Sequence, residues 1–197
     1  MIFVILGPSG CGKGTQAALL AQRYGLTHIS TGDLLRTAYE QKTPLGLKAY
    51  EWWGKGLWAP TKFTGPLLQA ELQKYPRGGF VLEGWPRLSE QKEFLAKFLS
   101  GRNLIIDKVF YLDTPAEVAV ERIKGRIKRA LSMGASMRID DREEVIKQRL
   151  QSYFQTIEPI LGYYRRLGAL EVIDNRPSIE EVSGSISKII DDYLKKA

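Results

Sequence analysis

The sequence predicts an α/β fold in which helices cover both faces of a five-stranded parallel sheet. Short apolar, β-branched runs alternate along the chain with longer segments whose apolar residues recur at helical spacing. A glycine-rich turn joins the first apolar run directly to the first helical segment. With 44% hydrophobic and 26% charged residues, the composition is that of a globular protein, so we expect one domain over residues 1–197.

Each expected strand is a short apolar run, and the first of them ends at Gly7. The expected strands are residues 2–6, 27–30, 80–83, 109–112 and 170–174. Gly25 ends the first helix, and Ser89 and Ser178 have the pattern of helix N-caps. The expected helices are residues 13–24, 33–41 and 44–53, followed by helices that begin at Ser89, Pro115 and Ser178, the last reaching about Tyr193. Parallel strands place their C-terminal ends at one edge, where ligands bind.

Two segments depart from this alternation. Residues 32–75 contain no clear strand, and residues 126–138 show no periodicity around Met133–Met137. We expect both segments to be mobile arms over the ligand site. The alternative for each is an ordinary surface insertion.

The charge distribution indicates an anionic partner. The net charge is +7, and residues 122–149 hold nine basic and four acidic residues, a local balance of +5. Nucleic acid and a polyphosphate ligand both fit this composition. A single cysteine, Cys11, excludes an intramolecular disulfide and a cysteine-built zinc site, and His28 is the only histidine. We expect His28 to be a satisfied core residue.

The first apolar run is too short for a signal peptide, and no stretch of about 18 apolar residues exists. We therefore expect a cytoplasmic protein with no membrane partner.

The turn after the first strand reads Gly-Pro-Ser-Gly-Cys-Gly-Lys-Gly-Thr over residues 7–15, which is the order of a P-loop. Glycines allow successive backbone N–H groups to turn toward a phosphate, and the helix that follows points its positive end at the same anion. Lys13 supplies a compact positive charge for the outer phosphates. The residues expected to bind ATP here are Gly10, Cys11, Gly12, Lys13, Gly14 and Thr15. Gly14 stands where the general pattern has Ser or Thr.

The ending Lys13-Gly14-Thr15 resembles that of adenylate kinases and their close relatives. Further segments are similar to that family's motifs in the same order. They are Ser-Thr-Gly-Asp-Leu-Leu-Arg at 30–36, Gly-Phe-Val-Leu-Glu-Gly-Trp-Pro-Arg at 79–87 with Gln91 beyond, Leu112-Asp113 with Glu121-Arg122 and Gly125-Arg126, Arg138-Ile139-Asp140-Asp141 with Arg149, and Tyr163-Tyr164 with Ile173-Asp174. The resemblance covers nearly the whole chain.

The resemblance implies a P-loop NTPase fold with a monophosphate-binding arm at residues 30–60 and a short lid at 123–140. The implied reaction is ATP + AMP ⇌ 2 ADP, with Mg²⁺ and in a monomeric enzyme. It implies no nucleic-acid partner, and we see no nucleic-acid motif. No direct metal ligand is expected, although Glu83, where the family usually has Asp, is a candidate for holding magnesium-bound water.

The resemblance also assigns roles to side chains, most of them arginines, whose planar fork binds two phosphate oxygens at once. Arg122 would stack on the adenine of ATP, and Asp140 and Asp141 would be hinge partners and acceptors for the arginines. The implied catalytic residues are Lys13, Arg87, Arg126, Arg138 and Arg149. Further ATP-binding residues are Arg122, Arg126 and Arg176. The implied monophosphate-binding residues are Thr31, Arg36, Leu57, Trp58, Ala59, Gly84, Trp85, Arg87, Gln91, Arg138 and Arg149.

The base pocket departs most from the family pattern. Thr31 and Gln91 are the adenine-associated choices, but Trp58, Ala59 and Thr61 replace residues nearer Leu, Val and Asp, and Trp85 replaces Phe. The tryptophans fill the core or reshape the pocket toward CMP, UMP or a deoxynucleotide. The sequence also leaves open a non-catalytic P-loop module and a nucleic-acid-binding protein, the latter suggested by a pI near 9.4.

Overall fold

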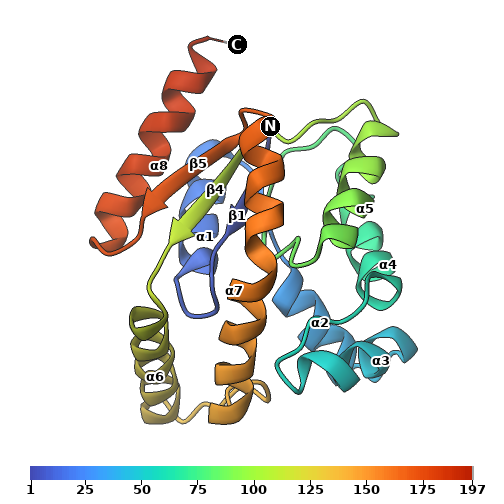
Figure 1. Cartoon of the computed structure of the whole chain (residues 1–197), viewed down its shortest axis with the longest axis vertical. Helices are drawn as coiled ribbons and strands as arrows, with labels where there is room; N and C mark the ends of the chain where they lie inside the picture. The colour runs from blue at the N-terminus through green and yellow to red at the C-terminus, as the bar shows by residue number, and fades with distance from the viewer. Residues whose placement is uncertain (197) are drawn as a thin grey trace.

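The computed structural model describes residues 1–196 and shows the expected three layers (Figure 1). All five strands are parallel, in the order β2-β3-β1-β4-β5. The strands are β1 Ile2–Leu6, β2 Thr27–Ser30, β3 Phe80–Glu83, β4 Lys108–Asp113 and β5 Leu170–Asp174. The expected strand positions and the expected fold class are confirmed.

Helices fill the connections between the strands. The helices are α1 Lys13–Tyr24, α2 Thr31–Glu40, α3 Pro44–Trp53, α4 Thr61–Leu72, α5 Ser89–Ser100, α6 Ala116–Ser132, α7 Glu143–Arg166 and α8 Ile179–Leu194. Within the described residues 1–196, no helix is both long enough and apolar enough to cross a membrane.

The side chains of β1 divide the core into two clusters. Phe3 and Ile5 point to one face and pack with residues of α1 and α8. Val4 and Leu6 point to the other face and pack with residues of α4, α5 and α7. All four are at most 1% exposed, because a strand of a doubly covered parallel sheet is buried on both sides. Figure 1 shows α8 and α7 on opposite sides of β4 and β5.

The two segments without a strand pattern contain more helix than the sequence suggested. Residues 32–75 hold α2, α3 and α4, and the last of these was not expected. The expectation that residues 126–138 lack periodicity was wrong for their first half, because α6 continues to Ser132. Ile123 and Ala119 of α6 are buried, and they form a small apolar cluster with α7 that holds the helix in place.

Helix caps agree with the sequence at Gly25, which ends α1, and at Ser178, and they differ at Ser89 and Pro115. Ser178 forms a capping box with Glu181 at the start of α8, as expected. Ser89 is the first residue of α5, with Leu88 at the cap position, so its expected capping role was wrong. Pro115 lies just before α6, one position earlier than expected. Ser30 caps α2 by accepting from the Asp33 N–H, which starts the helix at Thr31.

Candidate active site

The C-terminal ends of the strands bring the predicted motifs to one edge of the sheet. β3 lies between β1 and β2, and Glu83 pairs in register with both Ile5 and Ser30. The glycine-rich loop after β1, the start of α2 after β2 and the Gly84–Arg87 turn after β3 therefore begin side by side. They line one cavity of about 840 Å³, a size suited to small-molecule ligands.

The loop after β1 has the backbone geometry of a phosphate cradle. Gly10 and Gly12 have φ values of 86° and 95°, which residues other than glycine rarely adopt. A Cβ on Gly10 would also collide with the backbone oxygen of Ala119 in α6. Within the described chain no side chain caps α1, so the positive end of this helix faces the cavity without a protein partner.

Lys13 is folded back over this loop. Its Nζ donates to the backbone oxygens of Gly7 at 2.9 Å and Pro8 at 2.8 Å, and the residue is 7% exposed. Burial lowers the pKa of the Lys13 amine, because the charged form loses hydration. A phosphate in the cradle would replace that lost hydration with a direct ion pair.

A buried amide holds the loop from behind. Asn175, which follows β5, donates from Nδ2 to the Cys11 oxygen at 2.7 Å and to Thr114 Oγ1 at 2.8 Å. Arg122 of α6 donates to the same Cys11 oxygen at 3.0 Å and to the Asn175 oxygen at 2.8 Å. These bonds connect the ends of β4 and β5 to the loop and fix its C-terminal half.

Arg87 is held in an aromatic setting. Its Cζ lies 4.7 Å from the ring centre of Trp58 and 5.5 Å from that of Tyr153. Its Nε donates to the Gly84 oxygen at 2.7 Å, and its backbone N–H donates to Gln91 Oε1 at 2.7 Å. Burial lowers the pKa of the Arg87 guanidinium, and its Nη1 has no hydrogen-bond partner within residues 1–196. This nitrogen is a buried donor whose hydrogen-bonding capacity is unused within the described chain.

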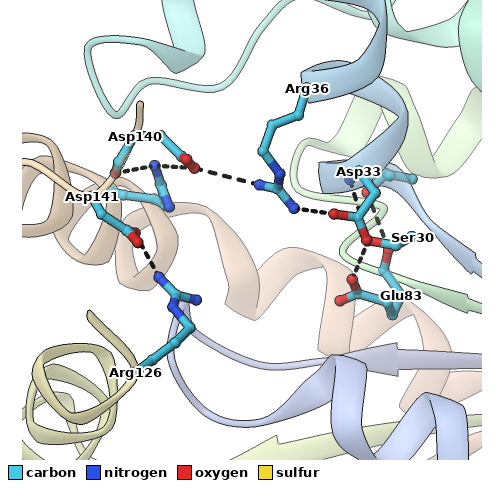
Figure 2. A network of polar contacts seen from close by, with 9 residues as sticks. Ser30, Asp33, Arg36, Glu83, Arg126, Asp140 and Asp141 are labelled. Atoms are coloured by element: carbon cyan, nitrogen blue, oxygen red, sulfur yellow. Dashed lines mark hydrogen bonds and ion pairs between the residues drawn. The ribbon is translucent and has the colours of Figure 1, made fainter. Parts of the chain in front are cut away.

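Three other arginines of the site, Arg36, Arg126 and Arg149, pair with aspartates (Figure 2). Asp140 lies 2.8 Å from Arg149 Nη2 and 3.6 Å from Arg36 Nη1, measured to its Oδ2. Arg36 also contacts Asp33 at 2.5 Å, and Figure 2 shows Arg36 reaching between Asp33 and Asp140. Asp140 is 4% exposed, and its Oδ1 has no partner in the described chain.

Asp141 makes a second, separate pair with Arg126 of α6, at 2.5 Å. Asp140 and Asp141 therefore act as acceptors for the arginines, as the sequence indicated. Burial is the main cause that lowers the pKa of the Arg149 guanidinium, and the neighbouring Asp140 carboxylate opposes it.

Nearly all of the predicted site residues line the same cavity. From the loop and the arginine set these are Gly10, Cys11, Gly12, Lys13, Gly14, Thr15, Arg36, Arg87, Arg122, Arg126, Arg138 and Arg149. From the base-pocket set they are Thr31, Leu57, Trp58, Ala59, Gly84, Trp85 and Gln91, with Glu83 beside them. Arg176 is the exception, because it is exposed and pairs with Asp174 at 2.9 Å away from the cavity wall.

The tryptophans have different surroundings. Trp53 and Trp85 are 8% and 3% exposed and belong to the core, whereas Trp52 is 39% exposed. Trp58 lines the cavity and packs against the main core cluster. Its Nε1 donates to Thr156 Oγ1 at 3.1 Å and to the Ser152 oxygen at 3.3 Å, both in α7.

The comparisons with known proteins agree with this geometry. The family model described as "Adenylate kinase" matches residues 5–169, more than half of the chain. The chain belongs to the adenylate kinase family. An adenylate kinase of Clostridium novyi (strain NT) is 36% identical over 97% of this chain and 99% of its own length. Adenylate kinases of Nitrobacter winogradskyi and Clostridium botulinum (strain Loch Maree / Type A3) are 36% and 35% identical, each over 96% of this chain.

The adenylate kinase resemblance missed two features of the site. It gave no role to Asn175, whose only sequence signal is its position directly after the last strand. It also gave no role to Asp33, although this residue stands three positions before Arg36 on α2, a spacing that favours an ion pair. The expectation for His28 was wrong, because its buried Nε2 has no partner in the described chain and the residue borders the cavity.

Proposed function

We propose that this chain catalyses the reversible transfer of a phosphoryl group from ATP to AMP, giving two ADP. The observation that carries the proposal is one cavity that joins a P-loop with Lys13 to a separate cluster of arginines. Two anionic ligands can occupy such a cavity end to end. The family membership and the full-length similarity to proteins named adenylate kinase support the same reaction.

The mechanism is one of alignment and charge, since phosphoryl transfer asks little covalent chemistry of the protein. The loop N–H groups and Lys13 would hold the phosphates of ATP. Arg87 and Arg36 would hold the monophosphate, and Arg126, Arg138 and Arg149 would meet the charge on the transferred group. The acceptor is already a phosphate anion, so no general base is needed.

We propose residues 30–60 as the monophosphate-binding arm and residues 123–140 as the lid. The first contains α2 and α3, and the second contains the end of α6 with the turn that leads to Asp140. Both border the cavity through arginines, Arg36 from the arm and Arg126, Arg129 and Arg138 from the lid. Closure over bound nucleotides would exclude water, which otherwise competes as the acceptor.

The residues present fit Mg²⁺ held mainly by nucleotide phosphates and water. Among the described residues no cluster of three or more His, Cys, Asp or Glu side chains forms a direct site, and Mg²⁺ in phosphate-transfer sites keeps several waters. Glu83 borders the cavity and accepts from Ser30 Oγ through its Oε1, so its second carboxylate oxygen can hold such a water. The ion would neutralise phosphate charge.

A coupled assay of ATP consumption tests the proposal, with Mg²⁺ and AMP, CMP, UMP, GMP or dAMP as separate acceptors. We expect the highest kcat/KM with AMP. A preference for CMP or UMP would instead identify a pyrimidine monophosphate kinase with the same fold. Absence of transfer to every acceptor, with ATP still bound, would overturn the proposal in favour of a non-catalytic nucleotide-binding module.

A further inference from the structure

Arg87 is the one proposed phosphate ligand whose guanidinium stacks on aromatic rings. Within the described chain no carboxylate oxygen lies within 4.0 Å of it, whereas Arg36, Arg126 and Arg149 each pair with an aspartate. A partly buried cation without a counter-ion needs another source of stabilisation. The face of a Trp ring supplies one, through the attraction between a cation and the ring quadrupole.

The ring that supplies it is itself fixed in place. Trp58 lies in the segment between α3 and α4, and its N–H bonds reach across to α7. Thr156 Oγ1 donates to the Ser152 oxygen at 2.9 Å, which leaves a lone pair of this hydroxyl to accept from Trp58 Nε1. An indole that is packed on one face and hydrogen-bonded at its edge has little freedom to turn.

The ring contact occupies none of the hydrogen-bond donors of Arg87. Nε is occupied by the Gly84 oxygen, while Nη1 has no partner in residues 1–196. A carboxylate would fix Arg87 by occupying the same N–H groups that a phosphate needs. A ring face stabilises the cation without accepting a hydrogen bond from any of those N–H groups.

We propose that Trp58, held by Thr156, is a positioning residue that orients Arg87 toward the phosphate of the acceptor nucleotide. This inference rests on the proposed function and names the part of the acceptor on which Trp58 acts, the phosphate and not the base. The sequence alone left open whether Trp58 fills the core or selects the base.

A comparison of AMP with adenosine tests the inference, because only AMP has the phosphate. The KM for AMP and the inhibition constant of adenosine against AMP are measured at saturating Mg–ATP for Trp58→Leu. We expect the KM to rise roughly three- to tenfold, the range of a partly desolvated cation–π contact. The adenosine constant should stay within about twofold, the size of a surface change.

Equal weakening of AMP and adenosine would overturn the inference and make Trp58 a wall of the base pocket. No change in either constant would overturn it as well. Trp52→Leu is the matched control, since Trp52 is exposed on α3, and we expect it to change neither constant. Failure of the proposed function would appear separately, as absence of AMP turnover in the unsubstituted enzyme.

Two milder variants separate a positioning role from a loss of folding. Trp58→Phe keeps a ring face but has no N–H, so it should restore most of the AMP affinity that Trp58→Leu loses. Thr156→Val removes the nearer of the two acceptors of the indole N–H and leaves the Ser152 oxygen. It should raise the KM for AMP about twofold to threefold, as expected for one neutral hydrogen bond. In the Trp58→Phe background the Thr156→Val effect should vanish, and its persistence would contradict the linkage through the indole.

Discussion

Arg87 and Arg149 both line the cavity, but the protein holds them in different ways. Arg87 stacks on the rings of Trp58 and Tyr153 and keeps a free Nη1. Arg149 donates to the side chain and to the backbone oxygen of Asp140. If both arginines bind phosphate as proposed, the first does so without giving up an ion pair, whereas the second exchanges a carboxylate for the phosphate.

The difference follows from where the two arginines lie. Arg87 belongs to the turn after β3, against the core, while Asp140 connects α7 to Arg36 on α2. The Asp140 carboxylate reduces the repulsion between the two positively charged guanidinium groups of Arg36 and Arg149 when no phosphate is bound. In the proposed monophosphate site, one arginine is therefore held by aromatic rings and the others by a carboxylate that takes the place of the phosphate.

The largest expected effects are on kcat/KM, and they come from replacing Arg87 or Arg149. The free energy of unfolding should distinguish the two substitutions. Arg87→Met should lower kcat/KM for phosphoryl transfer by about 10³-fold without lowering the free energy of unfolding by more than about 0.5 kcal/mol, because a buried cation without a counter-ion is removed. Arg149→Met should lower activity and also lower the free energy of unfolding by about 1–3 kcal/mol, since Asp140 loses its nearest partner.

The coupled assay and urea unfolding measure these two quantities on the same preparations. Equal destabilisation by both substitutions would contradict the view that aromatic rings hold Arg87 and a carboxylate holds Arg149 in energetically different ways.

Asp140→Asn tests the carboxylate side directly. Without nucleotide, its free energy of unfolding should fall by about 1–3 kcal/mol, because Arg36 and Arg149 lose a shared counter-charge. Saturating AMP should raise its unfolding temperature more than that of the unsubstituted protein, since the phosphate supplies the missing negative charge. Thermal unfolding with and without AMP measures both. Asp174→Asn is a control from an exposed pair, and a similar response in it would argue against the substitute-anion role.

The pH dependence of ATP use tests the protonation state of Lys13, which is a buried cation of the P-loop. Burial lowers the pKa of Lys13 below its usual 10.5, and only the ammonium form pairs with phosphate. We expect kcat/KM for ATP to fall about tenfold per pH unit above that lowered pKa, so the alkaline limb should begin below pH 10.5. A limb that begins above pH 10.5 would contradict the lowered value, and the residual activity of Lys13→Met should lack the limb.

Deprotonation of Lys13 does not destabilise the folded protein, so it cannot cause the alkaline fall in activity by unfolding the protein. Its pKa is lower in the folded than in the unfolded chain. The unfolded chain therefore binds more protons between the two values, and the contribution of Lys13 to stability increases with pH in that window. Circular dichroism across the same pH range checks that the protein stays folded.

The smallest expected effect comes from a charged residue that belongs to the proposed monophosphate-binding arm, residues 30–60, but lies outside the cavity. Lys48 pairs with Glu51 at 2.9 Å on α3, and both side chains are more than half exposed. Lys48→Ala should change the free energy of unfolding by no more than about 0.5 kcal/mol and leave the KM for AMP unchanged. A clear rise in KM would show that the arm acts through its general charge and not through the arginines at the cavity.

Sequence reasoning worked best where a signal is local. The five strands, the glycine turn and the Ser178 cap were all predicted, because alternation, backbone freedom and capping depend on neighbours in the chain. Features that depend on tertiary packing, such as the length of α6, were not predicted from the sequence. The second half of α6 lacks a clear apolar pattern, yet the helix continues to Ser132, and the partly buried Ile127 packs against the apolar cluster that α6 forms with α7.

The fold class, the P-loop and the set of arginines could be predicted from the amino-acid sequence, since each is specified by residue types at short spacings. Only the tertiary structure decided how each arginine is held. Trp58 and Thr156 lie far from Arg87 in the chain, as Asp140 does from Arg36, and no local pattern encodes which of them meet. They meet because helices and connecting segments pack against one another and against the sheet, as Trp58 packs on the core cluster that includes residues of α7. That packing depends on burial over the whole core.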